Sequence, residues 1–214
     1  MARVNNIYTG AVIDLKAIPE CNILQLNADN LIIGSAVTLA NISESDFYPL
    51  MSKACARIAD HTMQCKITLA GNICGTIIYK EAILPLLLSE CTVIVASGKK
   101  LRPRPITEVF NEKLRLSQGE FIVQFIIDAK YLTLPYYHIK RTKNEKIDYP
   151  ILSLSAIKDH KNLQIALSGI CAFPFRSQKI ESIFNNKNLS IDKKMSTIID
   201  NLPAPVLNDI YATD

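Results

Sequence analysis

Three observations predict an α+β fold for this sequence. Runs rich in β-branched residues, at residues 91–96 and 121–127, are typical of buried strands. Apolar residues between Phe47 and Ala59 recur at steps of three and four, as they do on one face of a helix. After about residue 129, β-like segments come first and helical patterns follow. This mixture excludes an all-helical bundle.

The elements expected in the first 128 residues follow from local patterns. β-prone segments at residues 11–15, 23–26 and 31–34, with a turn at 28–30, predict strands that include a hairpin. Helices are expected over residues 47–59 and 81–88, the second with Pro85 near its first turn. The runs at 91–96 and 121–127 form buried strands, and Pro103 and Pro105 place the segment between them at a sheet edge.

The pattern changes near residue 129, which predicts two domains, residues 1–128 and residues 129–214. In the second domain, residues 134–141, 151–157 and 163–170 are β-like and predict a three-stranded meander. Beyond Pro174 the apolar spacing becomes helical, and Asp192 lies near the start of the second expected helix, where its charge is favourable.

Composition narrows the class of protein. The chain has 214 residues, 49% of them hydrophobic, and a formal net charge of +4, so it is long and apolar enough to bury a large core. It has no apolar run of membrane-spanning length and no signal-peptide pattern. The six cysteines form no CxxC pair, as expected of reduced, structural thiols. We therefore expect a cytoplasmic protein with no membrane partner.

The sequence lacks the residue patterns of a hydrolase, a zinc site or a strongly basic nucleic-acid-binding surface. There is no GxSxG motif, and the three histidines are scattered, which argues against a hydrolase. His61 and Cys65 would share a helical face, but together with Cys74 they lack the paired spacing of a zinc site, so we expect no metal site. Basic residues near 99–104 and 140–146 are mixed with carboxylates, as on a solvated surface. We therefore expect no nucleic-acid partner. A nucleic-acid-binding module is a third hypothesis, and it predicts binding that weakens steeply with salt.

One segment has the chemistry of an anion site. The usual nucleotide loops, GxGxxG and GxxxxGK[ST], are absent. Residues 68–72, with the sequence Thr-Leu-Ala-Gly-Asn, are small enough for successive backbone amides to face an anion. Thr68 adds a hydroxyl donor, and Asn72 can fix the loop or reach the ligand. Alone, such a segment is more often an ordinary turn.

An ordered set of motifs gives this segment more weight. The set comprises residues 12–15, 31–39, 68–74, 93–97, 147–156 and 165–170. In content and order it resembles the FAD-binding medium subunit of molybdenum hydroxylases, the xanthine dehydrogenase and carbon monoxide dehydrogenase family. The resemblance implies a vanillyl-alcohol-oxidase (PCMH) type FAD domain in residues 1–128, followed in residues 129–214 by a carbon monoxide dehydrogenase flavoprotein-like domain with a three-stranded sheet and helices.

The resemblance also implies a cofactor, partners and site residues. FAD would receive electrons from a molybdopterin-binding large subunit through a [2Fe-2S] small subunit, and pass them to NAD or another acceptor. No residue of this chain is expected to be catalytic or to bind a metal. The residues carried over to FAD binding are Thr68, Leu69, Ala70, Gly71 and Asn72 near the pyrophosphate, Glu81 beside the flavin or its ribityl chain, the apolar Ile122, and Lys140.

The chain departs from the family pattern at several points. The resemblance begins after the family's AGGTDL-like loop, Ala70 stands in place of a glycine, and Gln64-Cys65 replaces an Arg-Asn pair. Glu81 is one methylene longer than the family's aspartate. Lost phosphate contacts, each worth roughly 1.5–3 kcal/mol, predict weakened FAD binding. The leading hypothesis is an FAD-carrying subunit of a molybdenum-dependent dehydrogenase, and the alternative is a flavin-free structural or interaction subunit that retains the fold.

Overall fold

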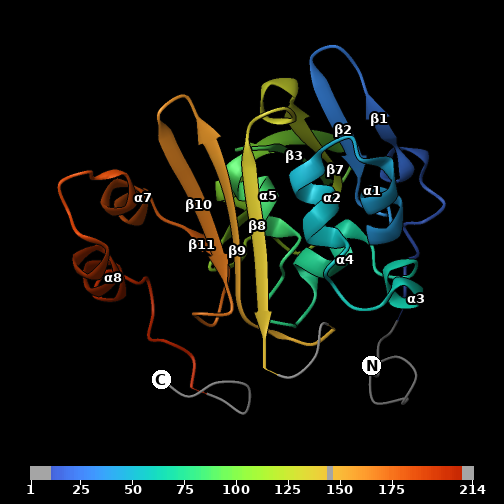
Figure 1. Cartoon of the computed structure of the whole chain (residues 1–214). Coiled ribbons are helices and arrows are strands. Elements are labelled where there is room, and N and C mark those ends of the chain that lie inside the picture. The colour runs from blue at the N-terminus through green and yellow to red at the C-terminus, as the bar shows by residue number, and fades with distance from the viewer. Residues whose placement is uncertain (1–10, 144–146, 209–214) are drawn as a thin grey trace.

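The computed structural model describes residues 11–143 and 147–208, so part of the second basic stretch lies outside the described residues. Two antiparallel sheets lie on either side of a group of short helices (Figure 1). The predicted α+β class is confirmed. Within the described ranges, no helix has the length and apolar character needed to cross a membrane.

The first sheet has five strands. Its order is β1 (Leu24–Leu26), β2 (Asn30–Gly34), β7 (Glu120–Asp128), β3 (Thr92–Ser97) and β4 (Lys100–Pro105), all antiparallel. The predicted hairpin is β1–β2, and the proline-containing β4 lies at the edge as expected. The strand predicted at residues 11–15 is wrong, because this segment has no regular structure and Asp14 instead accepts a bond from the amide of Lys16.

Among the described residues, six short helices lie in the part of the chain that forms this sheet. They are α1 (Leu39–Ser45), α2 (Pro49–Cys55), α3 (His61–Gln64), α4 (Leu69–Cys74), α5 (Ile83–Leu88) and α6 (Ile106–Val109), which is followed by the small hairpin β5 (Phe110–Asn111) and β6 (Lys113–Leu114). The 47–59 pattern is confirmed as α2, which is shorter than expected because Pro49 starts it and Ala59 has a φ of +56°. The helix expected over 81–88 is α5.

The second sheet has four antiparallel strands: β8 (Tyr136–Thr142), β9 (Pro150–Asp159), β10 (Asn162–Ser168) and β11 (Phe175–Arg176). The first three are the predicted meander. The fourth has only two residues, too few to show a period in the sequence. Helices α7 (Gln178–Asn185) and α8 (Ile191–Ile199) complete this part, and the 3₁₀ turns η2 (Pro19–Asn22) and η3 (Ala129–Tyr131) join elements elsewhere.

The two faces of the second sheet differ in chemistry. Ile165 and Leu167 belong to the small core under α7 and α8, which flank the sheet in Figure 1. On the opposite face, every second residue of β9 points toward α5. These residues include the buried Ser153 and Ser155. Ile157 on this face joins the main core with residues of the first sheet. The two sheets therefore share a core, and the domain boundary at residue 129 stays a prediction.

Gly34 allows a close approach between β2 and η2. A Cβ at this position would overlap the Cys21 carbonyl and lie 2.8 Å from the Asn22 nitrogen. The absence of a side chain lets the backbone of residues 34–36 bond with the 21–23 segment, through Gly34 N to Ile23 O and Ala36 N to Cys21 O. This contact fixes the position of Ser35.

Candidate functional site

The predicted anion loop is the first turn of a helix. Thr68 is the N-cap of α4, and its hydroxyl accepts a hydrogen bond from Gly71 N at 3.1 Å. The amide of Leu69 donates to Val37 O at 2.9 Å, that of Ala70 to Ser35 O at 3.2 Å, and that of Asn72 to Thr68 O at 2.9 Å. The expectation that successive amides face an anion is wrong, because capping and the neighbouring 35–37 segment already supply their acceptors.

A cavity of about 490 Å³ nevertheless lies beside this turn. Four of the predicted site residues line it: Thr68, Ala70, Gly71 and Ile122. The rest of the lining comes from the segment after the described N-terminus, from β2–α1 and from β6–β7, namely Asp14, Leu15, Lys16, Ser35, Ala36, Cys74, Leu114, Leu116, Glu120 and Phe121. We call it the apolar cavity, since Leu114, Leu116 and Phe121 give it a wall suited to a flat ring system.

A second cavity of about 360 Å³ adjoins the first and shares Lys16, Ala36 and Thr68 with it. Its remaining lining residues are Asn22, Leu24, Val37, Thr38, Asn41, Cys65 and Lys66. We call it the polar cavity. Among the described residues that line it there are two lysines and no carboxylate. The pair of cavities thus suits an elongated ligand with an apolar end and an anionic part.

Ser35 provides an independent sign of a polar ligand atom. The residue lines the apolar cavity and is 4% exposed, and its buried hydroxyl has no hydrogen-bond partner within the described structure. A buried hydroxyl left without a partner costs about 1–3 kcal/mol. A ligand atom that bonds Ser35 Oγ would remove this cost, so the residues present fit a dinucleotide such as FAD.

The other predicted site residues form a separate, buried cluster. The Glu81 carboxylate accepts a bond from Lys140 Nζ at 2.9 Å and another from the Ser153 hydroxyl. Lys140 Nζ also donates to Arg57 O at 3.0 Å. The side chains of Glu81 and Lys140 are only 6% and 2% exposed, and neither lines the apolar or the polar cavity. This cluster joins the segment before α5 to strands β8 and β9.

Asn72 links α4 to that buried cluster. Its Oδ1 accepts a hydrogen bond from Ala82 N at 3.3 Å, directly after Glu81. Of the two roles expected for Asn72, fixing the chain is the one that the structure shows. Leu69 is fully buried in the main core. Neither residue lines the two cavities, so both position the turn that Thr68 begins.

His138 lies on the same face of β8 as Lys140. Its Nδ1 is 3.0 Å from Ser155 Oγ, and its buried Nε2 has no partner in the described structure. Burial, followed by the charges of Lys53, Arg57 and Lys140, lowers the pKa of His138 from 6.5 to about 4. The imidazole is therefore neutral at physiological pH.

The sequence did not single out Ser35, Lys16 or Lys66. Ser35 falls inside the run 31–39 that supported the resemblance, directly after the glycine that brings β2 close to η2. Lys16 and Lys66 carry no motif, and only the folded chain brings them to one cavity.

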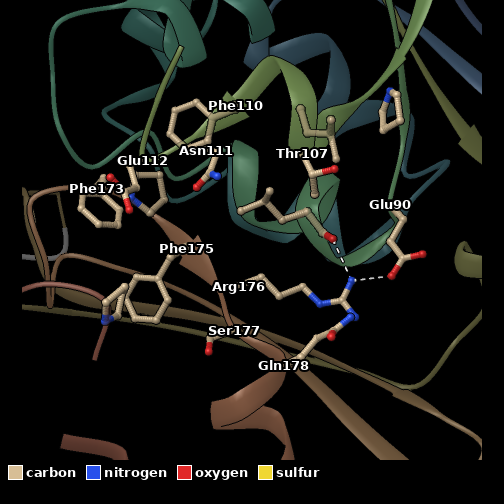
Figure 2. Close-up of a pocket in the computed structure, with 15 residues that line it drawn as sticks. Glu90, Thr107, Phe110, Asn111, Glu112, Phe173, Phe175, Arg176, Ser177 and Gln178 are labelled. Atoms are coloured by element: carbon tan, nitrogen blue, oxygen red, sulfur yellow. Dashed lines mark hydrogen bonds and ion pairs between the residues drawn. The ribbon is translucent and has the colours of Figure 1, made fainter. Parts of the chain in front are cut away.

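A cavity larger than these two, of about 650 Å³, lies elsewhere, between the α5–β5 region and the β11–α7 region (Figure 2). Its aromatic lining is Phe110, Phe173 and Phe175. Arg176 in this cavity is 2.9 Å from Glu90 Oε1 and 3.1 Å from Leu87 O, and its Nε donates to Glu181 at 2.7 Å. None of the predicted site residues lines this cavity. The Arg176 guanidinium already bonds the carboxylates of Glu90 and Glu181.

Solved structures of several enzymes share this fold. Quinoline 2-oxidoreductase from Pseudomonas putida 86 matches with a TM-score of 0.82 and 18% identity, over 97% of this chain and 76% of that one. Carbon monoxide dehydrogenase from Hydrogenophaga pseudoflava matches with a TM-score of 0.78 and 16% identity, over 91% of this chain and 72% of that one. The corresponding values for carbon monoxide dehydrogenase from Oligotropha carboxidovorans are 0.73 and 15%, over 89% and 71%. At these identities the likeness establishes the fold.

No curated protein sequence matches the chain. A family model does match: residues 1–129 fit the model described as the FAD binding domain in molybdopterin dehydrogenase. This match covers more than half of the chain, and it includes the first turn of α4, Ser35 and Ile122. The chain therefore belongs to the family of FAD-binding domains of molybdopterin dehydrogenases.

Proposed function

We propose that this chain holds FAD in the joined apolar and polar cavities, as the flavin subunit of a molybdopterin-dependent dehydrogenase or hydroxylase. The observation that carries the proposal is Ser35, whose buried hydroxyl has no partner among the described residues and which belongs to the wall of a cavity that four residues of the family's pattern also line. The two lysines of the polar cavity supply the positive charge that a diphosphate requires.

The chain's own residues bind and orient the cofactor. Thr68 lies where the two cavities join and Ile122 lines the apolar one, so they contact neighbouring parts of one ligand. The Glu81–Lys140–Ser153 cluster holds the segment that follows α4, and Asn72 transmits this support to the cavity wall. Bound FAD supplies the electron transfer, for which the protein provides only position and electrostatics.

The proposed partners are a molybdopterin-binding large subunit and a [2Fe-2S] small subunit, with NAD or another molecule as the electron acceptor. The proposal includes an enzyme of xanthine dehydrogenase type and a cytoplasmic setting. Two observations support it: the fold is that of subunits of quinoline 2-oxidoreductase and carbon monoxide dehydrogenase, and all six cysteines are free, as in a reducing compartment.

FAD titration of the purified chain tests cofactor binding. Quenching of flavin fluorescence should saturate at one FAD per chain. The double variant Lys16→Ala/Lys66→Ala should bind about tenfold more weakly at low salt, because two exposed positive charges near a diphosphate are lost. The exposed Lys179→Ala on α7 is the matched control and should bind as the wild type does. Saturable FAD binding with the same affinity in the wild type and in Lys16→Ala/Lys66→Ala would contradict the proposed placement of FAD.

Purification from the native source tests the partners. A complex that contains flavin, iron–sulfur and molybdenum subunits together would support the proposed electron path. The same complex with no flavin, together with no FAD binding by the pure chain, would instead support the flavin-free structural subunit.

A further inference from the structure

Cys65 lies in a group of three reactive or titratable side chains. Cys65 Sγ is 3.7 Å from His61 Nε2, one helical turn earlier, and the same nitrogen is 3.8 Å from Glu44 Oε1. The turn that carries the pair is held in place, since Asp60 caps α3 through Met63 N and the Gln64 side chain donates to the carbonyl groups of Ala56 and Ala59.

Cys65 also borders a cavity with two basic residues. Cys65 lines the polar cavity together with Lys16 and Lys66. An anionic reagent is attracted to such lysines. Access is open as well, because Cys65 is exposed, whereas Cys21, Cys55, Cys91 and Cys171 are buried.

Cys74 is a natural control within the same chain. It is the other exposed cysteine, but it lines the apolar cavity and not the polar one. Burial around the sulfur raises the pKa of the Cys74 thiol, although Lys80 acts in the opposite direction. Within the described structure no imidazole contact is found at Cys74 comparable to the contact of Cys65 with His61.

We propose that Cys65 is a site of reversible S-thiolation by anionic organic disulfides, and that the adduct occupies the polar cavity and so competes with FAD. The competition rests on the proposed function, whereas the thiol chemistry does not. Its reactant is a disulfide that carries carboxylates, of the type of oxidised glutathione.

The reaction is a thiol–disulfide exchange. The Cys65 thiol gives its proton to His61 Nε2, where the Glu44 carboxylate stabilises the positive charge. Cys65 Sγ then attacks one disulfide sulfur, a new S–S bond forms and the old S–S bond breaks. The electron pair leaves with the departing thiolate, which takes up the proton. Cys65 is oxidised and the departing half is reduced.

Reaction rates with two disulfides test the thiol assignment. Dithiobis(nitrobenzoate) is dianionic and dithiodipyridine is neutral, and both release a coloured thiol. The Cys74→Ser variant keeps Cys65 and should still react fast. Its rate should be about tenfold higher than that of the Cys65→Ser variant, in which Cys74 is the exposed thiol that remains. Lys66→Ala should slow the anionic reagent selectively, His61→Ala should slow both reagents, and Lys179→Ala should change neither. Equal rates at Cys65 and Cys74, or no effect of Lys66→Ala, would overturn the assignment.

A second experiment tests the competition and separates it from the proposed function. Saturating FAD should slow modification of Cys65 at least about tenfold. Prior S-thiolation with oxidised glutathione, checked by intact mass, should in turn weaken FAD binding at least about tenfold. FAD that binds with no effect on Cys65 would overturn the competition. If no FAD binds, the proposed function and the competition both fail, while a fast, lysine-dependent Cys65 still supports the thiol site.

Discussion

The first turn of α4 and the Glu81–Lys140–Ser153 cluster both contain residues that the family resemblance assigns to FAD binding, yet they lie in different surroundings. Thr68, Ala70 and Gly71 line a cavity. Glu81 and Lys140 are almost fully buried and bond each other at 2.9 Å. A charged pair in the interior holds elements together, whereas residues at a cavity are available to a ligand. Burial therefore separates residues that position the site from residues that contact its ligand.

The two regions are coupled through one side chain. Asn72 belongs to α4, and its Oδ1 accepts the amide that follows Glu81. A change in the buried cluster should therefore affect stability first and FAD affinity only through the position of α4. A change at the cavity should affect FAD affinity first and stability less. The predictions below separate these effects, starting with the largest.

Loss of the Glu81 carboxylate should give the largest effect. Glu81→Ala leaves the Lys140 ammonium buried without its carboxylate, and the free energy of unfolding should fall by about 3–5 kcal/mol. Urea unfolding measures this. The matched variant Glu81→Leu/Lys140→Met removes both charges and should recover most of the loss. A double variant as unstable as Glu81→Ala would show that the pair does not act through charge burial.

Acid should destabilise the protein through His138. The folded pKa of about 4 lies below the ordinary 6.5, so the unfolded chain binds the proton first as pH falls. The stability from this group is present above pH 6.5 and is lost toward pH 4, by about 3 kcal/mol in total. Urea unfolding at several pH values should show a shallower loss in His138→Gln. Equal pH slopes in the two proteins would refute this origin.

Removal of the link between the regions should give a smaller effect. Asn72→Ala leaves the buried Ala82 amide without its acceptor and should cost about 1–3 kcal/mol of stability. Asn72→Asp keeps an oxygen at this position and serves as the control. FAD affinity should fall together with stability in Asn72→Ala. Lower affinity at unchanged stability would instead indicate direct contact with the ligand.

The smallest effect on stability is expected at the cap of α4. Thr68→Val removes the acceptor of Gly71 N and a hydroxyl where the two cavities join, whereas Thr68→Ser retains both. Thr68→Val should cost about 1 kcal/mol of stability, as measured by thermal or urea unfolding. It should also weaken FAD binding more than the stability loss explains. If Thr68→Val binds FAD with wild-type affinity, Thr68 does not contact the cofactor.

Much of the fold was predictable because its signals are local. The β-like run at residues 151–157 predicts β9, and Pro103 and Pro105 predict the edge position of β4, each from a few neighbouring residues. The irregular conformation of residues 11–15 was not predictable, because a β-prone run becomes a strand only where the fold pairs it in a sheet, and the described structure assigns no strand there. The two-residue β11 is too short to leave any pattern.

The site was predictable only in part. The pattern at 68–72 located the cavity wall, but amides of small residues are free only if no neighbouring acceptor reaches them, and Val37 and Ser35 supply acceptors here. The pattern could not show that Glu81 and Lys140 meet 59 positions apart in the chain. Lys16 and Lys66 line one cavity only in the folded chain, and no local motif encodes this.

Hydrogen–deuterium exchange with and without FAD tests the placement of the cofactor most directly. Peptides that cover residues 35–41 and 66–74 border the two joined cavities, and peptides from 105–112 and 173–178 border the larger aromatic cavity. We expect FAD to slow exchange in the first pair and to leave the second pair unchanged. Slower exchange confined to 105–112 and 173–178, or no change anywhere at saturating FAD, would contradict the account.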